Sequence, residues 1–249
     1  MEKNNFLIYN EIVFNLYSCK KKDDLAQKLL LPLKILIPFS YSSILLADTE
    51  TEATFQENPI CYPESFSEAE NEYIKHSEDD PLKWLTNSQE STLIRESDLV
   101  AEERRLNSPL YIRCYKKYSV FDTLQYNIVY NHKFLGVITL FRTKIDGIFT
   151  EDDMFFLRSL GAHIQVVINQ IFSDNSNVIQ SNKVENFCKK YNFTKRESEI
   201  LNLLSKFCSN EEIAEKLDIS EHTIQKHYQN IFKKANVYSK WNLIKLMLN

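Results

Sequence analysis

Two helical patterns joined by a very short link constrain the fold of this chain more than any other feature. Residues 209–217 and 220–235 each begin with a serine suited to cap a helix, and only about three residues separate the two patterns. A link of that length is typical of a helix-turn-helix unit. Along the second helix, one apolar stripe is expected to be buried: Ile224, Tyr228, Ile231 and Ala235.

The opposite face of the second helix is rich in amides and lysines. Its polar residues are Gln225, Lys226, Gln229, Asn230, Lys233 and Lys234, and no acid occurs between His222 and Lys234. Amide side chains pair with adenine edges, and lysines pair with guanine or phosphate, so this face suits the DNA major groove. A small helical bundle that contacts another protein would show the same spacing, which leaves both interpretations open.

Charge is divided unevenly along the 249 residues. Residues 189–249 carry 11 Lys or Arg and 7 Asp or Glu, a formal charge of +4, whereas the preceding residues carry −8. A basic segment on an acidic body indicates a polyanionic partner for that segment, although a solvated basic surface would give the same count.

The basic segment has the periodicity of four helices. Their expected N-caps are Thr194, Ser209, Ser220 and Ser239. Glu197 and Glu212 stand three residues after the first two caps, which is the spacing of a capping box. The sequence therefore predicts an all-α, four-helix domain over residues 187–249.

The stretch FTKRESEILNLLSKFCSNEEIAEKLDISEHTIQKHYQNIFKKANVYSKWNLIKLML resembles the LuxR-type helix-turn-helix domain of bacterial transcription regulators. The match is ordered and free of gaps over about the last 56 residues. The matching residues include Thr194, Arg196, Glu197, Ser209, Asn210, Glu212, Ile213, Ala214, Leu217, Ile219, Ser220, Thr223, His227, Asn230, Ile231, Lys234 and Val237.

This resemblance implies sequence-specific major-groove binding by a recognition helix near residues 221–235. The predicted DNA-binding residues are Ser209, Ser220, Thr223, Gln225, Lys226, His227, Gln229, Asn230, Lys233 and Lys234. Among them, the two glutamines and Lys226 match family positions that face base edges. The threonine and the last two lysines match positions near phosphates, and the serines at helix starts suit phosphates as well. We expect His227 to pack half-buried or to contact a phosphate.

Four positions depart from the family pattern. Phe207 stands where a glycine follows the first helix, so we expect that turn to be shaped differently. Gln225 and Ala235 replace a lysine and a leucine. Lys240 replaces an arginine, which keeps the charge but loses the bidentate fork. The pattern thus predicts the fold of the domain but not its base preference.

Domains of this family bind two-fold DNA sites as dimers, with the last helix in the dimer contact. Here that helix spans residues 239–248 and carries Trp241, Leu243, Ile244 and Met247. These apolar side chains either form the contact of a homodimer or complete the monomer core, and both interpretations are open.

The first 173 residues mix helical and strand patterns. We expect helices over 5–18, 23–37, 64–76, 80–87 and 150–172, a buried strand over 41–47, and a hairpin of 120–130 with 134–143. This order resembles a GAF-like or PAS-like α/β sandwich sensor. The segment VITLFRTKIDGIFTEDDMFFLRSLGAHIQVVINQ is similar to the closing strand and helix of the GAF family.

The segment YPESFSEAENEYIKHSEDDPLKW is similar to the autoinducer-binding domain of quorum-sensing regulators. The shared positions are Tyr62, Pro63, Phe66, Asp80 and Pro81. Phe66 stands where a tryptophan is expected, and Glu70 stands where a tyrosine would bind the ligand. An acyl lactone is therefore one alternative for a small-molecule effector. Asp80 also suits a helix cap before Pro81, and we favour that role.

Aromatic residues supply the candidate effector pocket. Its predicted lining is Tyr41, Tyr62, Phe66, Asp80, Trp84, Tyr111, Tyr115 and Phe121. Because 12% of the chain is aromatic, we expect most of these rings to belong to the core.

Several function classes lack their signatures. No nucleophile–base pair or glycine-rich phosphate loop occurs, so we expect no enzyme, no catalytic residue and no cofactor. The five cysteines and five histidines lack metal-ligand spacing, which predicts reduced thiols and no metal site. A phosphorylation receiver would begin with a strand and place an acidic pair before Asp48, and this chain does neither. No run reaches the roughly 20 apolar residues of a membrane span.

These patterns predict an α+β chain with a sensor domain at residues 1–173, a polar linker at 174–186 and a DNA-binding domain at 187–249. We expect a cytoplasmic bacterial transcription regulator that binds double-stranded DNA as a homodimer and is gated by a small-molecule effector. The alternative is that the first half is a ligand-free protein-interaction module controlling the same DNA-binding domain. A cavity in the first half would favour the effector, and a solid core would favour the module.

Overall fold

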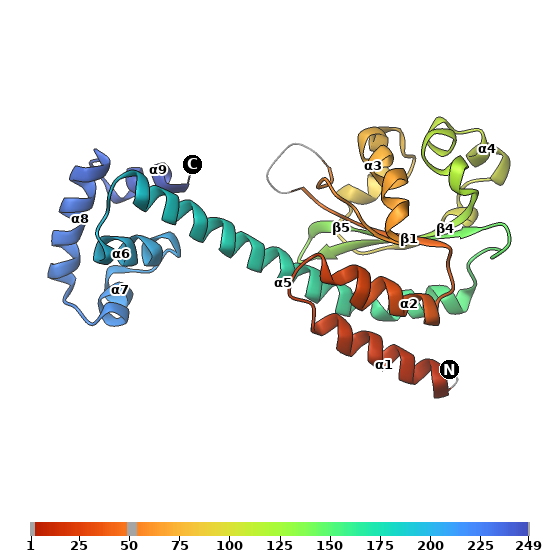
Figure 1. Ribbon diagram of the computed structural model, residues 1–249, viewed down its shortest axis with the longest axis horizontal. Coiled ribbons are helices and arrows are strands. Elements are labelled where there is room, and N and C mark those ends of the chain that lie inside the picture. Colours follow the sequence, from red (N-terminus) through yellow and green to blue (C-terminus); the bar gives the residue numbers. More distant parts are fainter. Residues whose placement is uncertain (1–2, 49–53, 249) are drawn as a thin grey trace. The chain divides into compact units, whose positions relative to one another are not determined.

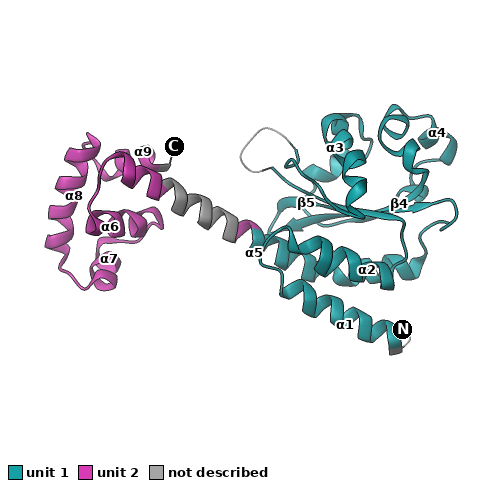
Figure 2. Ribbon diagram, in the orientation of Figure 1, with its two compact units in different colours: residues 1–171 teal, residues 172–249 magenta. Residues whose placement is uncertain are grey.

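The computed structural model describes residues 3–48 and 54–248 and divides the chain into two compact units, Met1–Ile171 and Phe172–Asn249 (Figure 2). Helix α5, Glu151–Lys190, runs from the first unit into the second. It is longer than the helix predicted over 150–172 and continues through the residues of the predicted linker. No glycine or proline occurs between residues 162 and 190, so nothing in the chain stops the helix. The side chains of residues 174–183 lie outside the described part.

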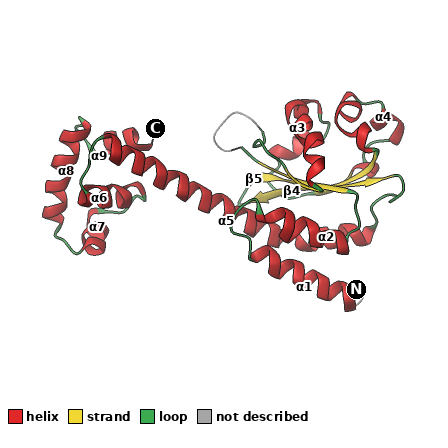
Figure 3. Cartoon of the chain, in the orientation of Figure 1, coloured by secondary structure: helices red, strands yellow, loops and turns green. Residues whose placement is uncertain are grey.

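The first unit is built on a five-stranded antiparallel sheet in the order β2-β1-β5-β4-β3 (Figure 3). Its strands are β1 (Tyr41–Leu46), β2 (Ile60–Tyr62), β3 (Leu93–Arg95), β4 (Val120–Tyr130) and β5 (Lys133–Thr143). Strands β4 and β5 form the predicted hairpin, with Tyr130 opposite Lys133. Both turn residues, Asn131 and His132, have positive φ angles of 49° and 61°, as a two-residue hairpin turn requires.

Helices cover both faces of this sheet (Figure 1). One face carries α1 (Lys3–Tyr17), α2 (Leu31–Leu36) and the first part of α5, with a π-helical turn at Ala26–Leu30 before α2. The other face carries α3 (Ser67–His76), α4 (Glu102–Leu106) and short helical turns. The segment predicted as a helix over 80–87 is a 3₁₀ turn, Lys83–Asn87.

The hairpin strands present alternate side chains to these two helical layers, because successive side chains of a strand point to opposite faces. The hydroxyl of Tyr126 accepts a hydrogen bond of 2.6 Å from the amide of Gln165 on α5. Thr123, Gln125 and Thr139 lie on the opposite face, toward α3 and α4. The predicted apolar stripe of α5 is buried: Phe156, Leu160, Ile164, Val167 and Ile171.

The contact between Tyr126 and Gly161 on α5 leaves no room for another atom. A Cβ added at Gly161 would lie 2.4 Å from the Tyr126 hydroxyl oxygen and 2.6 Å from its ring carbon. Gly161→Ala is therefore expected to lower the free energy of unfolding by about 1–3 kcal/mol, although alanine favours helices. Urea unfolding measures the change. The double variant Gly161→Ala, Tyr126→Leu should recover part of the lost stability, because leucine lacks the hydroxyl and ring atoms that meet the new methyl group. If Gly161→Ala alone is as stable as the parent, the close packing of Tyr126 on Gly161 is contradicted.

The second unit contains the four predicted helices, α6 (Lys195–Ser205), α7 (Asn210–Leu217), α8 (Glu221–Ala235) and α9 (Lys240–Leu248). Both predicted capping boxes are formed, at Thr194 with Glu197 and at Ser209 with Glu212. The end of α5 contributes Val184 and Phe187 to the core of this unit.

One expectation for this unit is wrong. The turn after α6 was expected to be shaped differently because Phe207 replaces a glycine. Instead, Phe207 adopts a φ of 60°, the left-handed conformation that glycine takes after a helix. The ring is 70% exposed, so solvent rather than packing surrounds this side chain. A non-glycine residue in this conformation costs on the order of 1 kcal/mol.

Candidate functional site

Helix α8 has one buried face and one exposed polar face. The predicted stripe is buried: Ile224, Tyr228, Ile231 and Ala235. The exposed residues on the rest of its surface include Gln225, Lys226, Gln229, Asn230 and Lys233. Their side chains carry donors and acceptors suited to base edges and phosphates, and no core contact occupies them. The polar face predicted from the sequence is therefore solvent-accessible in the folded unit.

The turn between α7 and α8 places the start of α8 at the surface. Asp218 has a left-handed φ of 50°, and the backbone N–H of Ile219 donates to the carbonyl of Ala214. The Ser220 hydroxyl then caps α8 by accepting from the backbone N–H of Thr223 at 3.2 Å. The Thr223 and Ser220 hydroxyls lie 2.9 Å apart, so both predicted phosphate-binding residues also stabilise the helix start.

Lys234 lies in a different environment from its neighbours. Its ammonium donates to the buried carboxylate of Glu197 at 2.6 Å and lies over the ring of Phe193. Burial favours the neutral form of Glu197, but the hydrogen bonds from Lys234 and Thr194 outweigh it and lower the pKa of this carboxyl below its usual value. Lys234 thus ties α8 to α6 through this ion pair, although the lysine itself stays partly exposed to solvent. His227 is half-buried, as expected.

The last helix divides its apolar residues between core and solvent. Leu243 and Met247 are buried in the core of the unit, and Ile244 packs partly against it. Trp241 is 71% exposed, and Leu246 is also exposed. Leu243 and Met247 therefore complete the core of the unit, and Trp241 does not.

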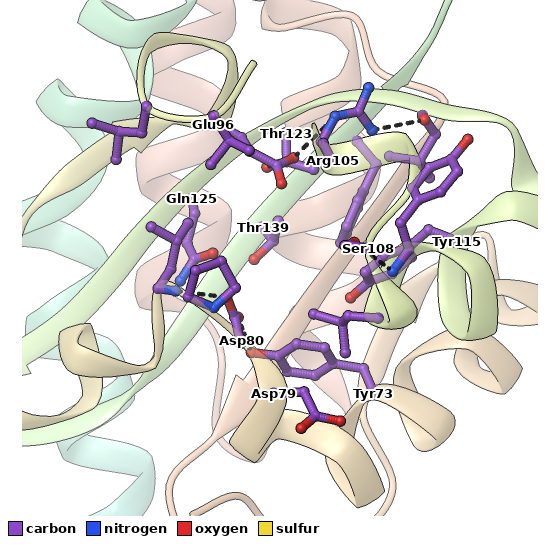
Figure 4. Close-up of a pocket in the computed structure, with 18 of the residues that line it drawn as sticks. Tyr73, Asp79, Asp80, Glu96, Arg105, Ser108, Tyr115, Thr123, Gln125 and Thr139 are labelled. Carbon is purple, nitrogen blue, oxygen red and sulfur yellow. Dashed lines mark hydrogen bonds and ion pairs between the residues drawn. The ribbon is translucent and has the colours of Figure 1, made fainter. Parts of the chain in front are cut away.

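A cavity of about 650 Å³ lies in the first unit, between the sheet and the layer that contains α3 and α4 (Figure 4). A volume of this size suits a small organic ligand. Three of the eight residues predicted to line a pocket line this cavity, namely Asp80, Tyr111 and Tyr115.

The other five predicted pocket residues lie elsewhere. Tyr41 and Phe66 stack on each other at 4.6 Å between ring centroids; Phe66 belongs to a buried core cluster, and Tyr41 packs against it. Trp84 is 54% exposed, and the partly buried rings of Tyr62 and Phe121 lie near the ammonium groups of Lys34 and Lys144. These positions follow from packing that an aromatic count does not reveal.

Four acidic residues line the cavity: Glu70, Asp79, Asp80 and Glu96. Asp79 is exposed, and the other three are buried or partly buried; Figure 4 labels Asp80 and Glu96. Glu70 on α3 accepts a hydrogen bond of 3.1 Å from the Tyr115 hydroxyl. Asp80 accepts from the Tyr73 hydroxyl at 2.6 Å and from the backbone N–H of Leu82 at 2.7 Å. The helical turn Lys83–Asn87 that follows has no side-chain cap, so the predicted helix-cap role of Asp80 is wrong, and Asp80 stabilises the preceding turn instead.

The third buried or partly buried carboxyl is Glu96, which follows β3. It accepts from the Thr123 hydroxyl at 3.2 Å and lies 3.9 Å from Nε of Arg105. The other guanidinium nitrogens of Arg105 donate to the backbone carbonyls of Val120 and Phe121. Arg105 is therefore held by the protein rather than free in the cavity.

Burial perturbs all three carboxyls in the same direction. Desolvation raises the pKa of Glu70 and that of Glu96 to about 7 each, and it raises the pKa of Asp80 above its usual value. Asp80 adds to both glutamate shifts, because like charges repel. Perturbed carboxyls that converge on a cavity are typical of functional sites.

Several polar residues of the cavity were not predicted from the sequence. They are Glu96, Arg105, Ser108, Thr123, Gln125 and Thr139. A signal was present in the hairpin, where polar Thr123, Gln125 and Thr139 recur on one face of otherwise apolar strands. That alternation indicates a strand face that is not packed into an apolar core.

Two features are absent from the described residues. None of the helices has both the length and the apolar character that crossing a bilayer requires. No group of three or more His, Cys, Asp or Glu side chains in those residues has an arrangement that would hold a metal ion.

Comparison with known proteins identifies the second unit. Residues 191–247 match the family described as "GerE: Bacterial regulatory proteins, luxR family". Over 55 residues the chain is 47% identical to the "Uncharacterized response regulatory protein YgeK" of Escherichia coli (strain K12). That match covers 22% of this chain and 37% of the YgeK protein, so it concerns one domain.

A solved structure of a ligand-binding domain, so described, resembles the first unit in fold. The VqsR LBD domain from Pseudomonas aeruginosa superimposes with a TM-score of 0.50 and 16% identity, covering 66% of this chain and 96% of that one. A GAF domain of a sensor histidine kinase from Bacillus halodurans gives a TM-score of 0.44 and 19% identity, over 63% of this chain and 99% of that one.

These findings confirm the predicted fold classes: a mixed helix-and-sheet unit followed by a helical one. The matched residues 191–247 include the helix-turn-helix of α7 and α8 and the exposed polar face described above. The C-terminal unit of this chain is therefore a domain of the luxR family of bacterial regulatory proteins.

Proposed function

We propose that this chain is a transcription regulator that binds double-stranded DNA through the exposed face of α8. The observation that carries the proposal is the set of uncommitted polar side chains on that face, within a unit that belongs to the luxR family. Gln225, Lys226 and Gln229 contact base edges, and Lys233 contacts phosphate. Lys234 contributes by fixing α8 against Glu197.

We further propose that the regulator acts as a homodimer on a two-fold site. Two recognition helices, each in one major-groove segment, read two half-sites about one helical turn apart. The exposed Trp241 of α9 supports this arrangement, since a large apolar ring in water gains from a partner surface.

The first unit acts as the sensor in this proposal. Its cavity of about 650 Å³ supports a small-molecule effector over a ligand-free interaction module, because a solid core would suit the module. Helix α5 links the units covalently, so a change in its first turns passes to the DNA-binding unit. The effector biases an equilibrium between two arrangements of the dimer, and only one of them fits both half-sites.

Mobility-shift titrations on the DNA upstream of this protein's own gene test the proposal. Gln225→Ala and Lys226→Ala are each expected to weaken specific binding by roughly 5- to 150-fold, since a good base contact contributes about 1–3 kcal/mol. Lys20→Ala, an exposed lysine of the first unit, serves as the control and is expected to change binding less than about twofold. Unchanged binding by both α8 variants would overturn the assignment of this face.

A further inference from the structure

The interior of the cavity in the first unit holds more acidic than basic side chains. Glu70, Asp80 and Glu96 are buried or partly buried there, and Arg105 is the only buried cationic side chain among the described residues of the lining. Arg104 and Asp79 also line the cavity, but both are exposed. The guanidinium of Arg105 is held by Glu96 and by two backbone carbonyls. Glu96 thus has a cationic partner within the protein, whereas Glu70 and Asp80 have only hydroxyl and backbone N–H donors.

Glu70 is the clearest unbalanced group. It is 1% exposed, and the titratable groups that surround it come from four segments: Cys61, Tyr73, Asp80, Cys114 and Tyr115. None of these groups is a cation. Asp80 is likewise held by a hydroxyl and a backbone N–H rather than by a basic side chain.

Glu96 has the one protein cation of this interior. Arg105 on α4 lies beside it, Thr123 donates to it, and Asp80 and Asp122 add negative charge. Carboxylates accept several hydrogen bonds each, so all three keep capacity for a donor that enters the cavity.

The remaining wall of the cavity is largely apolar. Leu110, Val137 and Phe141 line it, with the faces of Tyr111 and Tyr115. A ligand that fills this space buries hydrocarbon against those side chains and brings its polar end to the carboxyls. Burying a carboxylate without a partner is costly, and a ligand cation supplies the partner that the protein lacks.

We infer that this cavity binds an organic cation, a protonated amine or guanidinium on an apolar body, with the charged end between Glu70 and Asp80. The inference rests on the proposed sensor role of the first unit and names the chemistry of its effector. Neutral ligands lack the charge that these carboxyls leave unpaired.

The sign of the pH dependence separates a cation from a neutral ligand. The pKa values of Glu70 and Glu96 are raised to about 7, so both are partly protonated near neutral pH in the empty protein. A cation favours the ionised carboxylates, so its binding releases protons and tightens as the pH rises from 6 to 8. A neutral acceptor binds the protonated carboxyls instead and weakens over the same range.

Titration calorimetry on the full-length chain tests the inference with hexylamine as the probe and 1-hexanol as its neutral counterpart. Hexylamine stays cationic between pH 6 and 8, since its amine resembles that of lysine. We expect it to bind at least about ten-fold more tightly than hexanol at pH 8, as a charge-assisted hydrogen bond predicts. We also expect tighter binding at pH 8 than at pH 6.

Glu70→Gln is expected to reduce the affinity for hexylamine about ten-fold while leaving that for hexanol unchanged. Glu102→Gln, an exposed acid on α4 outside the cavity, is the matched control and should bind as the parent does. Absent hexylamine binding, equal binding of hexanol, or a Glu70→Gln variant that binds as the parent does would each overturn the inference. Mobility shifts measured without hexylamine test the DNA-binding role of α8 and do not involve the cavity. If DNA binding is intact and hexylamine does not bind, the inference about the cavity fails while the proposed DNA-binding function stands.

Discussion

Replacing Asp153 by asparagine is expected to lower the free energy of unfolding of the first unit by about 3–5 kcal/mol. Asp153 and Arg142 form a buried ion pair with 2.9 Å between Oδ2 and Nη1, and they are 7% and 5% exposed. Asparagine keeps the shape of the side chain but removes its charge. The guanidinium of Arg142 then stays buried without its paired carboxylate and keeps only carbonyl acceptors and the weaker attraction of Asp146.

The pair matters because it joins three segments. Arg142 on β5 also donates to the carbonyls of Pro38 and Ile148 at 2.8 and 2.7 Å, and Asp153 accepts from the backbone N–H of Thr150 at the start of α5. The central sheet is thereby fixed to the first turn of the long helix. A loosened pair weakens both the cap and the sheet contact.

The measurement uses the two tryptophans, which lie in different units. In a Trp241→Phe background, the fluorescence of Trp84 reports unfolding of the first unit alone during a urea titration. Asp152→Asn, an exposed neighbour that makes the same charge change, is the control and should stay within about 0.5 kcal/mol of the parent. If Asp153→Asn changes stability no more than Asp152→Asn, the pair contributes little.

Most helices and strands were predictable because their signals are local. The hairpin of β4 and β5 needed only two alternating runs and a turn that tolerates positive φ at Asn131. The capping boxes at Thr194 and Ser209 span three residues each. The length of α5 was underestimated because a polar, aperiodic segment was interpreted as a linker, although helix formation needs only the absence of breakers once a helix has begun.

The cavity was less predictable, because its residues meet only in the folded unit. Glu70 and Tyr115 are 45 residues apart in the chain, and Thr123 and Glu96 are 27 apart. No sequence period connects such pairs. Aromatic residues alone gave Tyr111 and Tyr115 correctly as lining residues but included Phe66, which packs fully into the core at 0% exposure.

The polar face of α8 depends both on a local sequence pattern and on contacts that form only in the folded unit. Period 3.6 separates its buried and exposed sides, and the structure agrees for Gln225, Lys226 and Gln229. The same period placed Lys234 on the polar face, and this residue is exposed, but its ammonium also pairs with Glu197 of α6. A long, flexible side chain at the edge of a helical face follows its nearest charge, which the sequence does not reveal.

The second large effect concerns pH, since the stability of the first unit is expected to fall between about pH 5 and pH 8. In the folded protein, burial raises the pKa of Glu70 to about 7, whereas in the unfolded chain a glutamate titrates near 4.3. Between these values the folded state binds more protons, so rising pH favours unfolding. The contribution of protonated Glu70 to stability is complete below the pKa of glutamate in the unfolded chain. It is lost as the pH rises through the pKa of Glu70 in the folded protein. Glu96 adds an effect of the same sign.

Glu70→Gln removes the titrating group while its amide oxygen still accepts from the Tyr115 hydroxyl. At pH 8 we expect this variant to be more stable than the parent by on the order of 3 kcal/mol, and at pH 5 nearly equal to it. Urea titrations followed by Trp84 in the Trp241→Phe background measure the difference. Glu72→Gln lies on the same helix but loses ion pairs with Lys75 and His76, so no gain is expected there. A Glu70→Gln variant with no gain at pH 8 would mean that water or a cation already solvates this carboxylate in the folded protein.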